Sequence, residues 1–224
     1  MKLLKSLLSA AAAACLVAAP LSAQAGLVLS VQDGVAAPTV VYDNGVGDQN
    51  AAIGRIVSDG SSGVWNYYFN IGTGVNVPPG APFGMHLTSH AENTGAGTLT
   101  VKLTETNLNF GAGGMTWVTG TFNGVIGALG DNFSYSVYVD PSNTAFGMPN
   151  TGLAMSGTGL SGIGGASVNL ANPFSMTLIA TYHAGNMPGV SSFDFKSNVP
   201  EPASIALVGL ALVGLGAASR RRKT

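Results

Sequence analysis

The feature that most constrains the fold of this chain is the alternation of apolar and polar side chains in several short segments. In residues 97–105 the apolar residues Leu99, Val101 and Leu103 alternate with threonines and a lysine. A period of two places the apolar side chains on one face of a strand and the polar ones on the other. The segment is therefore predicted to be a half-buried antiparallel strand.

Similar patterns recur through the central part of the chain. In residues 132–139 the side chains of Phe133, Tyr135, Val137 and Val139 fall on one face. Other segments rich in β-branched and aromatic residues, which favour strands, are Leu27–Val31, Thr39–Tyr42, Val64–Ile71, Met115–Phe122 and Phe174–Tyr182.

Clusters of Gly, Pro, Asn and Asp separate these segments, for example at residues 43–45 and 77–80. The central part of the chain has no window with sustained helical periodicity. Many short strands joined by turns predict an all-β domain, an antiparallel two-sheet β-sandwich of jelly-roll-like or Ig-like form. The Gly- and Ser-rich residues 152–165 are expected to form a long loop or a weak edge strand.

Charged residues are scarce and unevenly distributed. Six of the nine basic residues lie within the first five or the last five residues of the chain. Residues 26–199 keep three basic residues against nine acidic ones, a formal net charge of −6. This part has no basic patch and would repel a polyanion, so nucleic acid is not expected as a partner. A surface made mostly of Ser, Thr, Asn and Gly suits a secreted matrix protein better than a cytosolic enzyme.

The N-terminus has the three parts of a secretory signal peptide. Two lysines precede an apolar run at residues 7–19, and Ala23 and Ala25 supply the small residues of a cleavage site before Gly26. Residues 1–25 are therefore predicted to be a signal helix that engages the Sec translocon and is removed by signal peptidase.

Cys15 is the only cysteine of the chain. A lipoprotein would be cut before Cys15 and acylated there, but residues 12–14 are all alanine and lack the usual large aliphatic residue. If the cut follows Ala25 instead, the mature domain has no cysteine. It then has no disulfide, thiolate metal site or cysteine nucleophile, and its core alone must hold it together.

The C-terminus combines three features in order. A Pro-Glu-Pro tripeptide at residues 200–202 precedes a run of 17 residues, 203–219, in which two serines are the only polar residues. As a helix this run would span about 25 Å, which is at the short limit for crossing a membrane. The basic cluster at residues 220–223 is expected on the cytoplasmic side, which leaves the preceding domain outside.

This arrangement resembles the PEP-CTERM tail of proteins from exopolysaccharide-producing Gram-negative bacteria. The resemblance implies that a membrane protease, exosortase, recognises the tail, cuts near the Pro-Glu-Pro tripeptide and releases the domain or transfers it to the surface. The acidic residue of the tripeptide would serve recognition and not catalysis. Besides the apolar run, the matching residues are Pro200, Glu201, Pro202, Arg220, Arg221 and Arg222.

The predicted organisation is a signal peptide (1–25), a β-sandwich ectodomain (26–198) and a sorting tail (199–224) with a transmembrane helix. The protein is expected to pass transiently through the inner membrane and to reach the cell surface or the extracellular matrix. There it would act as a structural or adhesive protein associated with exopolysaccharide or biofilm. It is not expected to be an enzyme.

Two other functions stay open at this point, a secreted carbohydrate-binding module and an extracellular hydrolase. A binding module would need an exposed row of aromatic side chains. A glycoside hydrolase would need two carboxylic acids in one cleft, and Glu92 and Glu105 are the only glutamates of the ectodomain.

Residues 43–50 form a candidate metal-binding loop. Asp43, Asn44 and Asp48 lie close together on a glycine-containing backbone, and such hard oxygen ligands suit Ca²⁺. The spacing departs from the EF-hand pattern, and a tight turn with positive φ at Asn44 explains the same residues. Apart from this possible Ca²⁺, no cofactor is expected.

Histidines and aromatic residues are the remaining candidates. His86 and His90 would share a strand face about 13 Å apart, which is too far for one metal ion. Trp65, Tyr67 and Tyr68 are candidate sugar-binding residues, and one of the two tyrosines should be exposed because neighbouring side chains point to opposite faces. Trp117 could also stack on a sugar, and core packing is the alternative for both Trp65 and Trp117.

Overall fold

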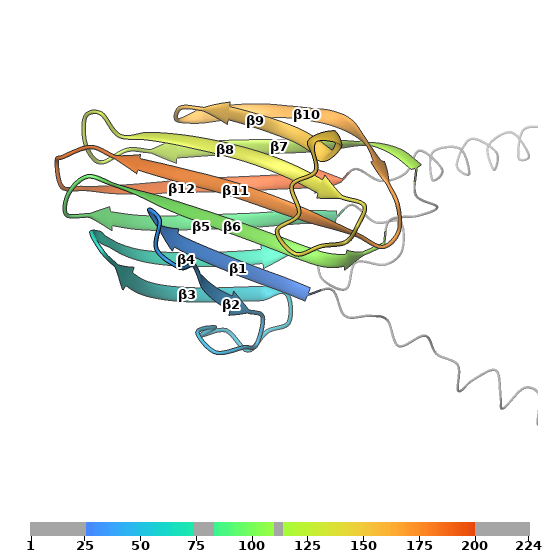
Figure 1. Cartoon of the computed structure of the whole chain (residues 1–224), viewed down its shortest axis with the longest axis horizontal. Coiled ribbons are helices and arrows are strands. Elements are labelled where there is room, and N and C mark those ends of the chain that lie inside the picture. Colours follow the sequence, from blue (N-terminus) through green and yellow to red (C-terminus); the bar gives the residue numbers. More distant parts are fainter. Residues whose placement is uncertain (1–25, 74–82, 110–113, 200–224) are drawn as a thin grey trace, which may run out of the picture.

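The computed structural model describes residues 26–73, 83–109 and 114–199. These residues form two six-stranded sheets packed face to face (Figure 1), and all paired strands are antiparallel. The predicted all-β class and two-sheet sandwich are therefore confirmed. The expected signal helix and transmembrane helix lie outside the described residues.

Sheet A has the strand order β2-β1-β6-β11-β8-β9. Its two central strands, β6 and β11, come from distant parts of the sequence and pair along most of their length. The strands of sheet A are β1 (Gly26–Asp33), β2 (Thr39–Tyr42), β6 (Gly97–Leu108), β8 (Asn132–Asp140), β9 (Leu153–Thr158) and β11 (Phe174–Ala184).

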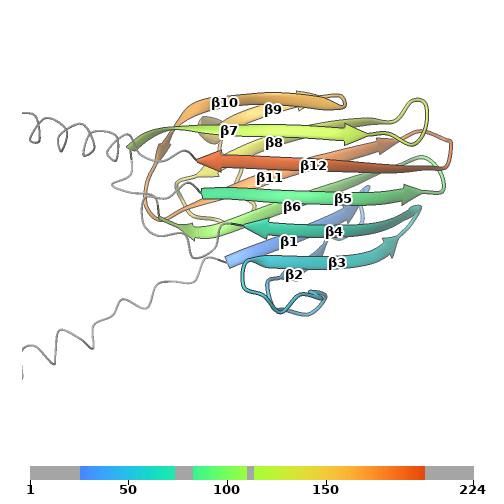
Figure 2. The same cartoon turned by 180° about the vertical axis from the view of Figure 1, so that it is seen from behind.

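Sheet B has the order β10-β7-β12-β5-β4-β3 and is seen from its own side in Figure 2. The last strand, β12, lies in the middle of the sheet between β5 and β7. The strands of sheet B are β3 (Arg55–Ser62), β4 (Trp65–Thr73), β5 (Phe83–Asn93), β7 (Gly114–Val125), β10 (Ser161–Leu170) and β12 (Gly189–Val199), and a short 3-10 turn, η1 (Asn150–Gly152), precedes β9.

The start of the first described strand and the end of the last one lie at the same end of the sandwich. β1 begins and β12 finishes at the same end in both views (Figures 1 and 2). The tail that follows Val199 is therefore attached at this end, and the turn between β11 and β12 lies at the opposite end.

Large aromatic side chains from both sheets fill the interior. Phe122 of sheet B stacks on Tyr135 of sheet A with ring centroids 4.3 Å apart, and it meets Phe195 edge-on at 5.5 Å. Trp65 of sheet B meets Tyr182 of sheet A at 4.8 Å. The contacts of Phe122 with Tyr135 and of Trp65 with Tyr182 join the two sheets across the space of about 10 Å between them.

The alternation found in the sequence predicts the inner faces correctly. Leu99, Val101 and Leu103 are at most 1 % exposed, and the four side chains predicted to line one face of residues 132–139 are all buried. Thr104 departs from the pattern because it lies on the outer face of β6 and is still fully buried. Its hydroxyl lies 2.9 Å from that of Thr177 and accepts the N–H of Phe146, which belongs to the loop after β8.

The glycine-rich residues 152–165 contain β9 and the first half of β10, and the chain passes here from the edge of sheet A to the edge of sheet B. Of the two expectations for this segment, the edge strand is confirmed. The glycines allow close approach to Tyr135: a Cβ at Gly157 or Gly162 would lie 2.5 Å or 1.9 Å from its hydroxyl oxygen. That hydroxyl donates to the carbonyl of Ser161 at 3.0 Å.

A buried polar network ties the loops at the end of the sandwich opposite to the tail. The hydroxyl of Tyr182 donates to the carboxylate of Asp131 and accepts from Ser191 at 2.6 Å. Asp131 also accepts the N–H of Gly185 at 2.8 Å, and Ser191 accepts the N–H of Gly127 at 2.9 Å. Burial, and then the hydrogen bond to Asp131, raise the pKa of Tyr182 to about 12.

Candidate functional site

A shallow groove lies on the outer face of sheet B over strands β3, β4 and β5. Its volume is about 470 Å³. Within it the ring of Tyr68, 43 % exposed, lies on β4 opposite His90 of β5 and Asp59 of β3. We call this surface the Tyr68 groove; its lining residues are Asp59, Gly60, Ser61, Asn66, Tyr67, Tyr68, His90 and Glu92.

The three candidate aromatics of β4 have different surroundings. Tyr68 is exposed as expected for one of the two tyrosines, whereas Tyr67 is half-buried with its ring against Gly60. Burial, and then the charge of Asp59, raise the pKa of Tyr67. Trp65 is only 1 % exposed and packs in the core, so its proposed role in sugar binding was wrong. Trp65 faces inward because it is an odd number of residues from Tyr68 on the same strand.

Trp117 has the opposite outcome. It lies on the outer face of β7 and is 55 % exposed, so the alternative of core packing is wrong for it and sugar stacking stays a prediction. Its indole rests on Gly165 of β10, where an added Cβ would be 2.8 Å from the indole nitrogen. The neighbouring Val118 faces the core, so the alternation along β7 is opposite to the one that a buried Trp117 requires.

A second, smaller hollow lies on the same outer face, farther along β4. It has a volume of about 240 Å³ and is more enclosed than the Tyr68 groove. We call it the Arg55 hollow. Its lining residues are Arg55, Asn70, Ile71, Gly72, His86 and Thr88.

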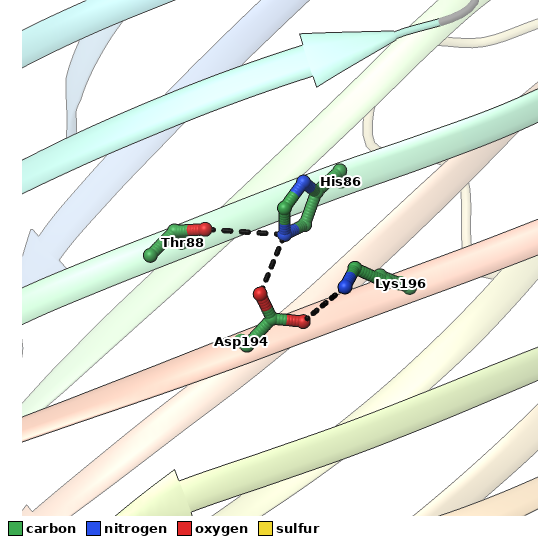
Figure 3. A network of polar contacts seen from close by, with 4 residues as sticks. All are labelled: His86, Thr88, Asp194 and Lys196. Atoms are coloured by element: carbon green, nitrogen blue, oxygen red, sulfur yellow. Dashed lines mark hydrogen bonds and ion pairs between the residues drawn. The ribbon is translucent and has the colours of Figure 1, made fainter.

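One wall of the Arg55 hollow is fixed by a polar network (Figure 3). Nε2 of His86 lies 2.6 Å from the carboxylate of Asp194 and 3.1 Å from the hydroxyl of Thr88. Nζ of Lys196 lies 3.3 Å from the other oxygen of Asp194. Burial opposes ionisation of Asp194, but the hydrogen bond and charge of His86, followed by those of Lys196, outweigh it and lower the pKa below its ordinary 3.8.

In the loop expected to bind Ca²⁺, the carboxylates accept hydrogen bonds from backbone N–H groups. Asp48 accepts the N–H groups of Asn44, Asn50 and Val57 at 2.9–3.0 Å, and Asp43 accepts the N–H of Gly54 at 2.8 Å. Asn44 has a φ of 57°, as the tight-turn explanation requires. Calcium binding by this loop stays a prediction, which calorimetry with Ca²⁺ tests.

Histidines and acids of the described residues are spread over the sandwich. Residues 26–73, 83–109 and 114–199 contain no group of three or more His, Cys, Asp or Glu side chains placed to hold a metal ion. His90 lies 3.7 Å from Glu92 on β5, while Glu105 is 1 % exposed on β6 of the other sheet. The two glutamates therefore lie on different sheets, one exposed and one buried.

The C-terminal tail matches a known protein-family model. Residues 198–223 match the family model of the PEP-CTERM protein-sorting motif. This chain carries a PEP-CTERM sorting signal. The match confirms the resemblance seen in the sequence and includes the Pro-Glu-Pro tripeptide and the arginines at residues 220–222. The PEP-CTERM motif implies export, a membrane-anchored sorting signal and exosortase as the processing partner.

Most of the residues named for export lie outside the described part of the chain. These are the sorting residues from Pro200 onward and the expected cleavage residues Ala23 and Ala25, whereas Gly26 is the first residue of β1. Within the described ranges, no helix has the length and apolar character needed to cross a membrane.

The sandwich itself has weak similarity to a solved structure. The isomalto-dextranase of Arthrobacter globiformis T6, complexed with panose, is 14 % identical with a TM-score of 0.26. The similarity covers 79 % of this chain and 30 % of that chain, and at this TM-score it supports no conclusion about activity. No curated protein matches this PEP-CTERM chain.

Proposed function

We propose that this PEP-CTERM protein is a structural and adhesive component of the cell surface or extracellular matrix, and that it holds polysaccharide in the Tyr68 groove. The sorting motif supports delivery to the outside of the cell. The observation that carries the adhesive role is the exposed ring of Tyr68 in a shallow groove lined by polar side chains.

The side chains around Tyr68 suit a sugar with free hydroxyl groups. An aromatic ring offers the C–H face of a sugar a flat apolar surface. The carboxylates of Asp59 and Glu92 accept hydrogen bonds from hydroxyls, and the amide of Asn66 can both donate and accept. An open, shallow groove is suited to a chain that extends beyond the site at both ends.

The position of the groove keeps it away from the point where the tail is attached. Val199, at the end of β12, pairs with Phe83, whereas His90 in the groove lies seven residues farther along β5. At about 3.3 Å per residue, these positions are about 23 Å apart. A domain held at its tail end would therefore still present the groove to surrounding polymer.

We also propose that the protein binds and does not hydrolyse polysaccharide. The groove does contain two carboxylates, Asp59 and Glu92, and a glycosidase needs two carboxyl groups within about 10 Å of each other, so release of reducing sugar from the bound polymer would overturn this proposal. A secreted carbohydrate-binding module of narrow specificity is the second candidate, since several hydrogen-bonding side chains surround one ring. Competition with a panel of defined oligosaccharides separates the two, because a matrix adhesive would be displaced by many of them and a specific module by few.

The test is a pull-down of the full chain with exopolysaccharide from the producing cells. Tyr68→Ala should weaken binding about tenfold, since the loss of one stacked ring costs roughly 1 kcal/mol or more. Tyr42→Ala is the matched control because Tyr42 is a 61 % exposed tyrosine on sheet A. Equal binding by both variants, with unchanged melting temperatures, would exclude the groove as the adhesive surface.

A further inference from the structure

Three basic side chains are placed in one row across the outer face of sheet B. Arg55 of β3 pairs with Gly72 of β4, Gly72 pairs with His86 of β5, and His86 pairs with Lys196 of β12. Arg55 and Lys196 are two of the three basic residues in a region of net charge −6. Arg55 and Lys196 bring two positive charges and the adjoining Asp194 one negative charge, so this part of an acidic domain has a positive formal charge.

Gly72 has no side chain, and the Arg55 hollow lies at its position in the row. A Cβ added at Gly72 would have nothing within 4 Å. Neighbouring strands are about 4.8 Å apart, so Arg55 and His86 stand roughly 10 Å apart on either side of the glycine. Asn70 and Thr88 add an amide and a hydroxyl along the side of the hollow.

Arg55 forms no ion pair with an acid of the described residues. The ion pairs of that part of the chain involve His86, His90 and Lys196. Asp194, the acid beside the hollow, is already engaged by His86 and Lys196. The acids nearest to Arg55 along the chain pairing, Asp43 and Asp48, accept the backbone N–H groups of Gly54 and Val57.

We propose that the Arg55 hollow binds the carboxylate of an acidic sugar within the polysaccharide that occupies the Tyr68 groove. This inference rests on the proposed function and names the class of its ligand. A guanidinium forms paired, charge-assisted hydrogen bonds with a carboxylate. Both sites are lined by β4, with Tyr68 and Gly72 four residues apart, so one short stretch of sugar chain reaches both.

The acidic side chains of the Tyr68 groove limit how densely charged the bound polymer can be. Asp59 and Glu92 line the Tyr68 groove and would repel carboxylates there. The ligand is therefore a polysaccharide with isolated acidic sugars separated by neutral ones, and a polymer charged at every sugar would be excluded. The same repulsion between negative charges is the reason that nucleic acid is not expected as a partner.

The test compares two forms of one polymer, a polysaccharide with one glucuronate in each repeat unit and the same material after chemical reduction of its carboxyl groups. The full chain in detergent should bind the acidic form about tenfold more tightly, as one charge-assisted contact provides. Arg55→Gln should lower binding of the acidic form to the level of the reduced form. Lys102→Gln removes the same charge from β6 of sheet A and should leave the difference intact.

The outcomes separate this inference from the proposed function. Equal binding of both forms by the unaltered chain overturns the carboxylate site and leaves adhesion through Tyr68 standing. Loss of both forms in Tyr68→Ala alone supports the groove independently of Arg55. If neither polymer binds, NMR titration with methyl glucuronide decides the hollow separately: shifts of the Gly72 and Thr88 amides support it, and their absence overturns it.

Discussion

The two faces of sheet B are formed by alternate residues of the same strands and differ in burial and in the kinds of side chain they carry. On β4 the inward residues Trp65 and Phe69 are at most 1 % exposed, while Tyr68 between them is 43 % exposed. The inner face has rings in contact with rings, whereas the outer face has charged side chains spaced around two hollows. An aromatic residue on such a strand is therefore interpretable only once its face is known.

The largest effect is expected for the inner face. Phe69→Ala removes a fully buried ring and should lower the free energy of unfolding by about 3–5 kcal/mol. Tyr68→Ala, one residue away, should change it by less than about 0.5 kcal/mol. Denaturant titration of both variants measures the difference, and similar losses in the two would contradict the assignment of faces.

The buried polar network predicts sensitivity to alkali. The pKa of Tyr182 is raised to about 12 from 10.0, so its stabilising contribution is complete below pH 10 and is lost as the pH rises to 12. The expected loss is about 2–3 kcal/mol. Unfolding measured between pH 8 and pH 12 checks this.

Tyr182→Phe serves as the control for the alkaline experiment. It should be less stable at pH 8, because Asp131 and Ser191 lose a hydrogen-bond partner, by about 1–3 kcal/mol. Its further loss between pH 10 and pH 12 should be much smaller. An unchanged alkaline slope in this variant would assign the effect to another group.

A gain of stability is expected on the outer face. Gly72→Val adds a β-branched side chain in open space and should raise the free energy of unfolding by about 0.5–1 kcal/mol. The same side chain would fill the Arg55 hollow and remove the preference for acidic polymer. A stabilised variant that still prefers the acidic form would show that the carboxylate binds elsewhere.

The smallest effect is expected for Asp194. Its pKa is lowered in the folded state, so its contribution is present above the ordinary pKa and is lost as the pH falls below about 4. Its side chain is 34 % exposed, and solvent screening limits the effect to a few tenths of a kcal/mol. Asp194→Asn should flatten the stability curve at low pH by that amount, and a loss of several kcal/mol would mean that the pair is not a surface pair.

The fold class was predictable because alternation is a local property of a strand. The segments at residues 97–105 and 132–139 show it clearly, and both have the predicted inner face. Strand β3 was missed because its second half is polar and glycine-containing, and the first half of β10 was expected only as a loop or a weak edge strand because glycines interrupt its pattern. Their pairing with β4 and β7 supplies what their own residues do not.

The candidate site was only partly predictable. Tyr68 was among the candidates, but Arg55, Asp194 and Lys196 carry no motif and are far apart in sequence. Their shared row follows from the pairing of β3, β4, β5 and β12. Alternation in residues 189–199, where Phe193 and Phe195 flank Asp194, was a signal that could have placed Asp194 on an outer face.

The sorting signal and the all-β class could be recognised without a structure, because both depend on short-range order: a contiguous tail of three features and a side-chain period of two. Which side chains meet became known from the folded domain. The fold buries Trp65, exposes Trp117, and places Arg55 and His86 on either side of Gly72. Strand pairing between distant segments sets these positions, since each pairing depends on how both inner faces pack and not on either strand alone.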